Sequence, residues 1–281
     1  MTNYEDVKAT ASKYNIQYFE NIKLLNMHFT LDSLTKLDES EDDHFWHRNR
    51  KFLLNILIKK FSKNRNFKLA DIGCGNGSII SFLEKKYSES KITGIDGHLN
   101  ALINVRRRTK KAFLQLQDIS QLSPLSEDQR YDIVILMDVL EHLDEPGEIL
   151  KQINNVLKKD GVIIATVPAL MTIWSDRDHF LGHRTRYSKK QFSQLFKTAG
   201  YSISKSNYFF TYLFVPTFLS RKLLVKFTNK SGKEIEEDEL KIIPILNQVL
   251  KFIGNIEMYI STFLSLPFGT STYCVAKKNV D

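Results

Sequence analysis

The chain has 281 residues, of which 42% are hydrophobic and 26% charged, and a formal net charge of +8. These proportions are typical of a soluble globular protein. Two distant cysteines, Cys74 and Cys274, exclude a disulfide framework or a cysteine metal site, so we expect a reducing, cytoplasmic location. The basic runs lack a nucleic-acid-binding module, so no nucleic-acid partner is expected, while contact with an anionic membrane surface remains compatible with the charge.

Residues 1–46 are expected to form an N-terminal helical segment. Tyr18, Phe19 and the apolar residues of 22–27 favour helix, and 38–43 is an acidic, exposed link. Residues 1–6 contain no apolar run, so no secretory signal is expected. His44–His47 is interpreted as an aromatic anchor rather than a metal site, because no further ligand is near in the sequence.

An amphipathic helix over 50–61 leads into the stretch that organises the chain, residues 68–78. Here a short apolar run ends in Asp71, and Gly73, Gly75 and Gly77 follow at every second position. This pattern predicts a strand, a tight loop and a helix start. Because glycine permits positive φ and close approach, the loop can hold a small polar ligand at the strand end. The alternative is a glycine-rich turn without a ligand.

Two later strands are also expected to end in acids. Asp96 follows the apolar run 91–95, about 20 residues beyond the glycine loop, where an acid accepts hydrogen bonds from ribose hydroxyls in nucleotide-binding folds. Asp118 ends a third strand within 112–119. The alternatives are a helix-capping aspartate at 96 and an ordinary turn aspartate at 118.

A fourth strand, 131–138, is continuously apolar, as buried central strands of parallel sheets are. It continues into a D-x-x-E-H pattern made by Asp138, Glu141 and His142. His142 is a candidate general base because its ordinary pKa suits proton removal near neutrality; the alternative is a histidine that holds the loop. A helix over 146–157, a stop at 158–161 and a fifth strand over 162–168 complete the alternating pattern of a parallel sheet.

Residues 169–187 follow a strand end and are rich in polar side chains, including His179, His183, Arg184 and Tyr187. Arginines here can clamp a carboxylate or phosphate, and the alternative is a salt-bridged loop. His179 and His183 lie four residues apart, but the sequence shows no carboxylate geometry that would complete a metal site with them, so none is expected.

A helix starting at Ser188 and ending at Gly200 precedes the last two strands, 201–210 and 272–278. About 60 residues separate these strands, and an acidic link is expected over 234–239 within them. This apolar insert can form a helical cap over the substrate site, lie on a membrane, or provide an oligomer interface. We favour a cap that contacts a membrane, and we expect no membrane-spanning helix, because the longest uncharged runs contain prolines.

The chain resembles the class I S-adenosylmethionine (SAM)-dependent methyltransferases. The resemblance is carried by three features in this order: an acid followed by G-x-G-x-G, acids at two later strand ends, and D-x-x-E-H. The resemblance implies an α/β, Rossmann-like, seven-stranded, mostly parallel sheet with helices on both faces, an antiparallel last strand and a helical insert before it. The expected domains are the segment 1–46, the core 47–210, the insert 211–270, and the last strand with its tail, 271–281.

The resemblance also implies site residues. Asp71, Gly73 and Gly75 would bind the methionine end of SAM, Asp96 the ribose, and Asp118 with Ile119 the adenine; Met137 and Asp138 would lie near the sulfur. His142 would be the base, with His179, His183, Arg184 and Tyr187 on the substrate side.

The implied activity is methyl transfer from SAM to a small-molecule or lipid-like acceptor, at oxygen, by in-line displacement. One alternative is a non-catalytic SAM-binding regulatory or scaffolding protein, which would not need His142. A nicotinamide-dependent dehydrogenase is disfavoured, because its fingerprint places the third glycine one residue later than Gly77.

Overall fold

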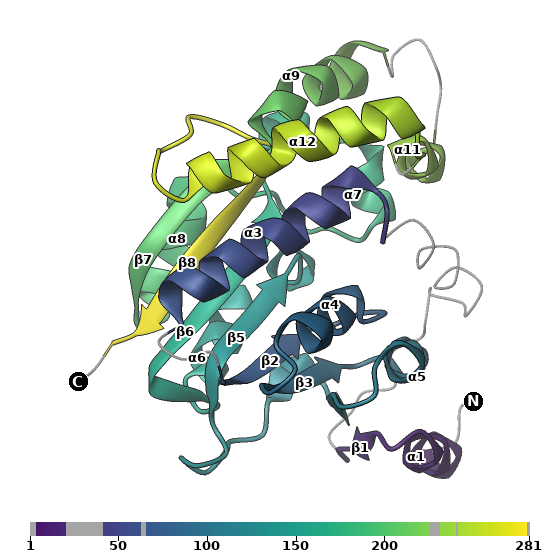
Figure 1. The fold of residues 1–281 in the computed structure, drawn as a ribbon, viewed down its shortest axis with the longest axis vertical. Helices are drawn as coiled ribbons and strands as arrows, with labels where there is room; N and C mark the ends of the chain where they lie inside the picture. The colour runs from purple at the N-terminus through teal and green to yellow at the C-terminus, as the bar shows by residue number, and fades with distance from the viewer. Residues whose placement is uncertain (1–3, 21–41, 63–65, 225–230, 240, 280–281) are drawn as a thin grey trace.

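The computed structural model describes residues 4–20, 42–62, 66–224, 231–239 and 241–279, whose strands form one eight-stranded sheet (Figure 1). The order across the sheet is β1-β4-β3-β2-β5-β6-β8-β7. Neighbouring strands are parallel except where β8 lies antiparallel between β6 and β7. The strands are β1 (Gln17–Tyr18), β2 (Lys68–Ile72), β3 (Lys91–Asp96), β4 (Phe113–Leu116), β5 (Tyr131–Met137), β6 (Leu157–Pro168), β7 (Tyr201–Phe209) and β8 (Ser271–Lys278).

The sheet has one strand more than the seven expected. The additional strand, β1, follows helix α1 (Tyr4–Lys13) and pairs with the outer edge of β4, which would otherwise carry unpaired backbone groups. Tyr18 therefore lies in a strand, and its assignment to a helix was wrong. The helix expected around 22–27 lies outside the described residues.

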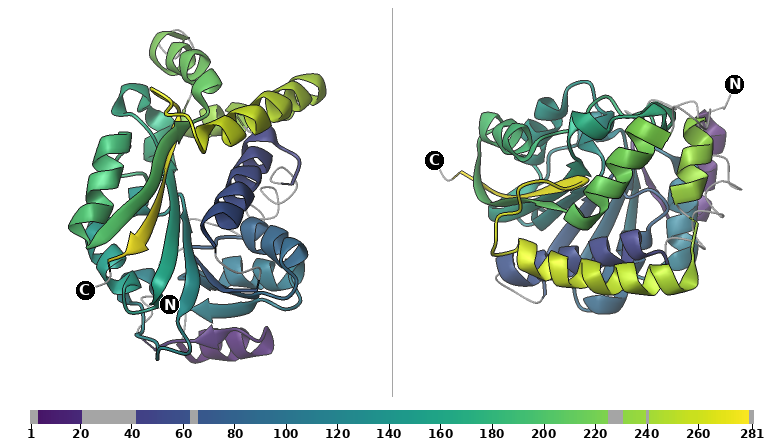
Figure 2. Two further views of the ribbon diagram at one scale, coloured as in Figure 1. Left: turned by 60° about the vertical axis from the view of Figure 1, so that its left-hand side comes forward. Right: turned by 90° about the horizontal axis from the view of Figure 1, so that it is seen from above.

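Helices cover both faces of the sheet, as predicted (Figure 2, left). One face packs against α3 (Phe45–Phe61), α4 (Ser78–Lys86) and α5 (Leu99–Arg108), and the other against α6 (Pro146–Ile153) and α8 (Lys189–Thr198). Alternate residues of the central strands supply the two cores: Ile133 and Ile135 join the first, and Val134 and Leu136 the second. β5 is thus buried on both sides.

One helix boundary differs from the prediction. The helix expected to reach 157 ends at Ile153, and Leu157 is already the first residue of β6. Leu157 pairs with Tyr131 of β5 and is fully buried. Sheet pairing and burial therefore outweigh the helical spacing of the apolar residues, a case of tertiary context overriding local propensity.

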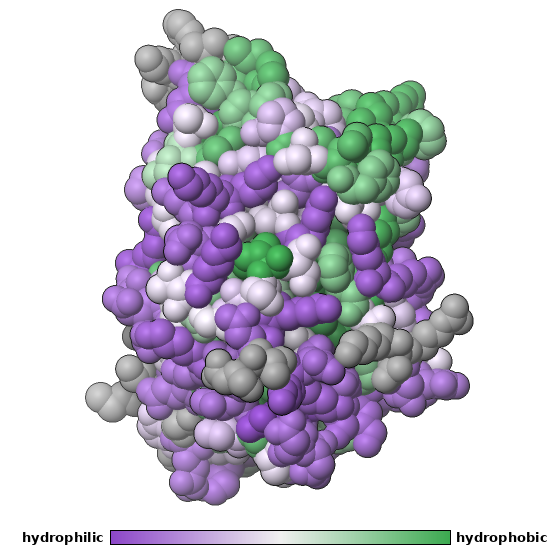
Figure 3. All heavy atoms as spheres, turned by 90° about the vertical axis from the view of Figure 1, so that its left-hand side faces the viewer, coloured by the Kyte–Doolittle hydropathy of each residue, from purple (hydrophilic) through white to green (hydrophobic). Residues whose placement is uncertain are grey.

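The insert forms a group of helices at one end of the molecule (Figure 1). Its described parts are α9 (Thr211–Leu219), the π-helix η4 (Ser220–Leu224), α11 (Gly232–Glu239) and α12 (Pro244–Ser261). The acidic stretch 234–239, expected to be a link, is helical instead: Ser231 and Glu234 bond each other at its start, and Ile235 is buried. Hydrophobic side chains gather at this end, whereas most of the rest of the face is hydrophilic (Figure 3).

None of the described helices is both long and apolar enough to cross a membrane.

Candidate active site

The glycine loop joins β2 to α4 and folds back towards β3. Gly73 and Cys74 both donate their backbone N–H to the carbonyl oxygen of Ile95, at 2.8 and 3.2 Å. Gly73 has φ +74°, and a Cβ there would lie 2.6 Å from a methyl group of Val139, so both backbone and space require glycine. A Cβ on Gly75 would meet nothing within 4 Å, so this side of the loop is open to a ligand.

A pocket lies along the open side of this loop. Four of the predicted cofactor residues line it: Asp71, Gly73, Gly75 and Met137. The remaining lining comes from the first turns of α3, the loop itself and the start of α4, namely His47, Arg50, Lys51, Cys74, Asn76, Ser78 and Ile79. The contribution of α3 was not predicted, because His44–His47 was interpreted as an aromatic anchor and 50–61 as an amphipathic helix.

Asp71 is the unusual group in this pocket. Its side chain is buried (2% exposed), and its Oδ2 has no hydrogen-bond partner among the described residues. Burial raises the pKa of Asp71 to about 8, and the nearby Asp96 adds to the effect, while Arg50 opposes it. A buried carboxylate without a partner is costly, so the position is suited to a cationic group of a ligand.

Asp96 and Asp118 stand at the ends of the next two strands and are both already hydrogen-bonded. Asp96 accepts from the Gly75 N–H at 2.8 Å through Oδ2 and from the His98 N–H at 2.9 Å through Oδ1. Each carboxylate oxygen has two acceptor sites, so Asp96 can accept further bonds. Asp118 caps the short 3₁₀ helix η1 (Ile119–Gln121) by accepting from Ser120 at 2.8 Å.

Asp138, directly after β5, is held by two partners. Its Oδ2 lies 2.8 Å from Nη2 of Arg50, and its Oδ1 accepts from the Thr166 hydroxyl at 2.9 Å. The Arg50 guanidinium also covers the Trp46 ring, 4.1 Å from its centroid. The N-terminal part of α3 thus closes over the end of β5. The sequence contained a signal for the contact between Arg50 and Trp46, since the two residues are four positions apart, which is about one turn of a helix.

The D-x-x-E-H pattern meets the loop after β6. His142, in the 3₁₀ helix η2 (Leu140–His142), places Nδ1 3.2 Å from the carbonyl oxygen of Gly182, and its ring centroid lies 4.9 Å from that of His183. Burial, followed by the nearby His183, lowers the pKa of His142. His183 in turn donates from Nδ1 to Oδ1 of Asp178 at 2.8 Å. Two predicted residues 41 positions apart are thus brought together.

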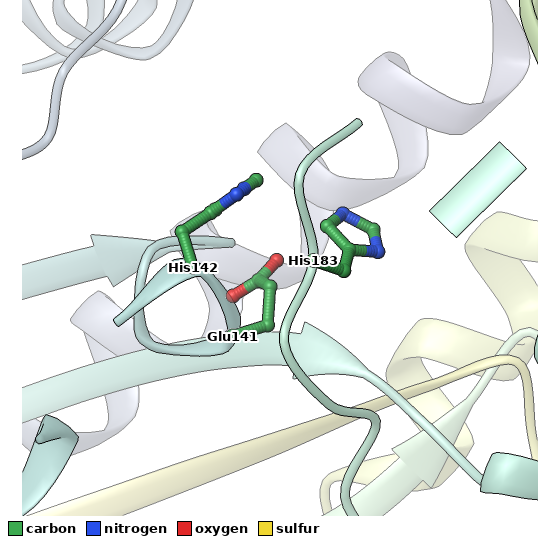
Figure 4. A group of neighbouring side chains, drawn as sticks. All are labelled: Glu141, His142 and His183. Carbon is green, nitrogen blue, oxygen red and sulfur yellow. The ribbon is translucent and has the colours of Figure 1, made fainter. Parts of the chain in front are cut away.

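Glu141 lies with this pair, although the sequence interpretation gave it no role. Its side chain is fully buried, and neither carboxylate oxygen has a hydrogen-bond partner among the described residues. One ligating atom each from Glu141, His142 and His183 lies within 4.8 Å of the other two (Figure 4). Burial and the nearby Asp138 raise the pKa of Glu141 well above its usual range.

The other substrate-side residues are not part of this cluster. His179, in α7 (Asp176–Phe180), is exposed and accepts from Nε1 of Trp174 at 3.0 Å. Arg184 is exposed and lies 3.3 Å from Asp144. Tyr187 is half-buried, and burial raises its pKa to about 12.

Behind His183, a buried ion-pair network ties the loop to the insert. Asp178 is fully buried, accepts from Nε of Arg186 at 2.7 Å and lies 3.7 Å from Arg221. Although burial opposes it, hydrogen bonds and charges of His183 and Arg186 hold the pKa of Asp178 below its usual range. Arg221 of η4 also makes a bidentate pair with Glu239 of α11, at 2.8 and 2.9 Å.

Comparison with known proteins defines the class. The sequence profile of a family described as "Methyltransferase domain" matches residues 42–206. The ubiquinone biosynthesis O-methyltransferase of Glaesserella parasuis is 31% identical over 114 residues, which is 36% of this chain and 45% of the relative. The malonyl-[acyl-carrier protein] O-methyltransferase of Bacillus cereus is 25% identical over 114 residues, covering 40% of this chain and 41% of the relative. The matches thus cover less than half of these two relatives.

Solved structures show the same fold. The plantazolicin methyltransferase BpumL, in complex with a desmethylated plantazolicin analogue and S-adenosylhomocysteine, superimposes with a TM-score of 0.58 over 98% of each chain at 17% identity. The Haemonchus contortus phosphoethanolamine N-methyltransferase 2, with SAM bound, gives 0.59 over 92% of this chain and 59% of that one at 16% identity.

The chain belongs to the class I SAM-dependent methyltransferases. SAM is the cofactor of this family. The residues present fit this cofactor, because Asp71 offers an unpartnered buried carboxyl to the cofactor's ammonium group, and Asp96 retains acceptor sites for hydroxyls.

Proposed function

We propose that the protein transfers the methyl group of SAM to a hydroxyl oxygen of a small-molecule or lipid-like acceptor. The observation that carries this proposal is the end of β5. Met137 lines the pocket on the glycine loop, and Glu141 and His142 stand a few residues further on with His183. One short segment therefore connects a cofactor pocket with a cluster of groups able to bind an acceptor and remove its proton.

The cofactor residues are assigned by their positions. We place the methionine end at Asp71, Gly73 and Gly75, the ribose at Asp96, the adenine at Asp118 and Ile119, and the sulfur near Met137 and Asp138. The ion pair between Asp138 and Arg50 helps to fix the backbone at Asp138, where φ is +59°. Such fixation matters because the reaction requires the acceptor atom, the methyl carbon and the sulfur to lie in line.

When bound, SAM supplies an electrophilic methyl group on a positively charged sulfur. Transfer to the acceptor oxygen would form the oxygen–carbon bond and break the carbon–sulfur bond, whose electron pair would remain on sulfur. The proton of the hydroxyl passes to Nε2 of His142, whose Nδ1 is occupied by Gly182. His183 borders the same space, and we assign the acceptor to it together with Tyr187, Arg184 and His179 of the surrounding loop.

The insert is proposed to act as a cap on this loop. Gly232, at the start of α11, packs directly against the Asp176 backbone, so that a Cβ would collide there. Arg177 of α7 pairs with Glu236, and Lys222 of η4 donates to the Trp174 carbonyl at 2.9 Å. In the proposed division into the segment 1–46, the core 47–210, the insert 211–270 and the final strand with its tail, 271–281, these contacts attach the insert to the core.

The lipid-like character of the acceptor is supported by α12, which is packed with its polar side inward. Its buried residues are Asn247, Gly254, Met258 and Ser261. Its exposed residues include an apolar stripe at helical spacing, formed by Ile245, Val249, Phe252, Ile256 and Tyr259. Outward-facing apolar stripes of this kind mark interaction surfaces, and we assign this one to a lipid surface.

Charge near the end of α12 favours an anionic lipid surface over a second protein chain. Lys60 and Lys189 donate to Thr262 and Ser265, both at 2.8 Å, beside the exposed Phe263. Burial and then these two lysines lower the pKa of Lys205, so the three positive charges lie close together. Lysines beside inserted aromatic side chains suit the headgroup region of a membrane.

Methylation at oxygen is tested with SAM carrying a ¹³C-labelled methyl group and a panel of phenolic and lipid-hydroxyl acceptors. The proposal expects a product whose methyl resonance is that of a methoxy group, and loss of its formation in His142→Ala with SAM binding retained. Methyl transfer only to nitrogen or carbon would contradict it. SAM binding without transfer to any member of the panel would favour a non-catalytic regulatory or scaffolding role.

A further inference from the structure

Glu141, His142 and His183 form one cluster, and the proposed reaction gives Glu141 no role in it. We propose that these three side chains bind a divalent transition-metal ion of the zinc class, and that the ion holds the acceptor's oxygen. The binding site stands on its own geometry, whereas its role towards the acceptor rests on the proposed function.

Glu141 is the first reason for this assignment. A carboxyl that is fully buried and has no hydrogen-bond partner on either oxygen is rare, because leaving a buried polar group unpaired is costly. Neither of the two imidazoles beside it among the described residues is hydrogen-bonded to it. A divalent cation supplies the missing partner and favours the ionised carboxylate.

The hydrogen bonds of both histidines are the second reason. Nδ1 of His183 bonds to the Asp178 carboxylate at 2.8 Å, and Nδ1 of His142 lies 3.2 Å from the Gly182 carbonyl oxygen. Metal-binding histidines characteristically donate their other ring N–H to a carboxylate or a backbone carbonyl, which fixes the tautomer and the ring orientation. Here both kinds of partner are present, and both leave Nε2 with its lone pair.

The spacing of the three groups is close to that of an occupied site. The candidate ligating atoms lie within 4.8 Å of one another, and Figure 4 shows the Glu141 carboxylate pointing towards the space between the two rings. Ligands about 2.0–2.1 Å from a zinc ion lie about 3.3 Å apart, so small side-chain rotations would close the site.

The ligand types select the class of ion. Two imidazoles with one carboxylate suit zinc and its transition-metal neighbours, whereas magnesium and calcium prefer oxygen ligands alone. Asp138 is not a member of this group, and its carboxylate is held by Arg50 and Thr166 instead. Three protein ligands leave at least one position open, which is the pattern of catalytic rather than structural sites.

An acceptor hydroxyl in the open position would lose its proton more readily, because a bound divalent ion lowers the pKa of a coordinated hydroxyl. The proton would then leave to solvent. His142 cannot be both ligand and base through the same nitrogen, so with the ion bound its role changes from removing the proton to holding the ion.

The test uses the full chain after treatment with a chelator, titrated with Co²⁺ and followed by visible absorption. We expect one Co²⁺ per chain, with the bands of a low-coordinate site, and displacement by Zn²⁺. Glu141→Gln keeps the size of the side chain but removes its charge. This variant and His183→Ala, each tested alone, should weaken Co²⁺ binding at least tenfold. His179→Ala is the matched control, because this histidine lies in the same loop, is exposed and bonds Trp174 instead; it should bind Co²⁺ as the wild type does.

Thermal unfolding supplies a second readout, because an ion that binds only the folded state raises the melting temperature. Zn²⁺ should raise it for the wild type and His179→Ala but not for Glu141→Gln. The proposal is overturned if the wild type binds no Co²⁺, or if Glu141→Gln and His183→Ala bind it unchanged. Calorimetric titration of the same chelator-treated samples with SAM separates the metal site from the proposed function. A failure to bind SAM would leave the Co²⁺ result intact, and a failure to bind Co²⁺ would leave the SAM result intact.

Discussion

Asp71 shows how one residue links the fold to the cofactor. Its carboxyl is buried at the end of a central strand, where, among the described residues, Arg50 is the opposite charge that acts on it. The pKa of about 8 means that in the cofactor-free protein this acid is mainly protonated at neutral pH, whereas in the unfolded chain, with a value of 3.8, it is ionised. Folding therefore takes up a proton here.

This shift predicts a pH dependence of stability. Since the pKa of Asp71 is raised in the folded state, its contribution to stability is complete below about pH 4 and is lost as the pH rises through 8. Asp71→Asn removes the titrating group, so the melting temperature of the wild type relative to Asp71→Asn should fall steadily between pH 5 and 8. A constant difference across this range would show that Asp71 does not have the raised pKa.

At Asp96, substitution tests the ribose assignment. Asp96→Ala should weaken SAM binding by about 2 kcal/mol, roughly 30-fold, because buried hydroxyl donors and the Gly75 N–H lose their acceptor. Calorimetry measures the effect. His98→Ala is the control, since it removes the imidazole whose Nδ1 lies 3.1 Å from Oδ1 of Asp96 but leaves the carboxylate and the backbone N–H of residue 98 in place. Unchanged affinity in Asp96→Ala would remove the assignment.

Which residues of the site could be predicted depended on how far apart in the sequence the interacting residues lie. The acids and glycines of the loop are local, and their pattern was sufficient to predict the strand, turn and helix that present them. The pairing of His142 with His183 and of Arg50 with Asp138 joins segments 41 and 88 residues apart, which no local pattern specifies. The presence of Glu141 in the pattern was visible, but its lack of a partner is a property of three-dimensional packing alone.

At the scale of elements, the contact between α12 and α3 attaches the insert to the core. Gly254 lies so close to Asn49 that a Cβ would collide with its side-chain amide, and Asn49 also donates to the Leu250 carbonyl at 3.2 Å. Gly254→Ala should therefore destabilise the protein by about 1–3 kcal/mol in denaturant unfolding.

A second helical glycine provides the comparison. At Gly147 of α6, a Cβ would lie 3.8 Å from Leu195, an ordinary contact. Gly147→Ala should be neutral or stabilise by up to about 1 kcal/mol, because alanine loses less backbone entropy in a helix. Equal effects of the two substitutions would contradict the close packing of α12 on α3.

The order of elements was largely readable because buried parallel strands are continuous apolar runs. The antiparallel pairing of β7 and β8 was expected across the insert and is confirmed by their register from Tyr201–Lys278 to Phe209–Ser271. The prediction was wrong where tertiary contacts decide: Leu157 enters β6 because it pairs with Tyr131, and 234–239 forms α11. Arg177 and Arg221 are the partners of that helix, and neither is near it in the sequence.

At the scale of the whole molecule, one end carries the apolar helices of the insert, and the cap on the loop after β6 belongs to the same insert (Figures 1 and 3). An acceptor embedded in a membrane could therefore reach the site without leaving the lipid surface entirely. Under the proposed lipid assignment, this arrangement would give the outward-facing side of α12 a function that the catalytic core does not need.

Flotation with vesicles of phosphatidylcholine and phosphatidylglycerol tests this surface. The wild type should float with the vesicles, less so at high salt because the lysines contribute. Ile245→Asp combined with Phe252→Asp should abolish flotation, since these side chains are 83% and 68% exposed. Phe113→Asp, at a 62% exposed phenylalanine of β4 in the core domain, is the matched control and should float normally. A wild type that stays in solution, or that sediments as a dimer lost in the double variant, would contradict the lipid assignment.

The most direct test of the account is a calorimetric titration of the cofactor-free protein with SAM at pH 7, in two buffers of different ionisation enthalpy, with NAD titrated separately. If the cofactor's ammonium group pairs with Asp71, SAM binding should release close to one proton in the wild type, whereas Asp71→Asn should bind more weakly and release none. NAD should not bind. Proton release that persists in Asp71→Asn, or binding of NAD in place of SAM, would contradict the central claim that the buried acid of the glycine loop receives the methionine end of the cofactor.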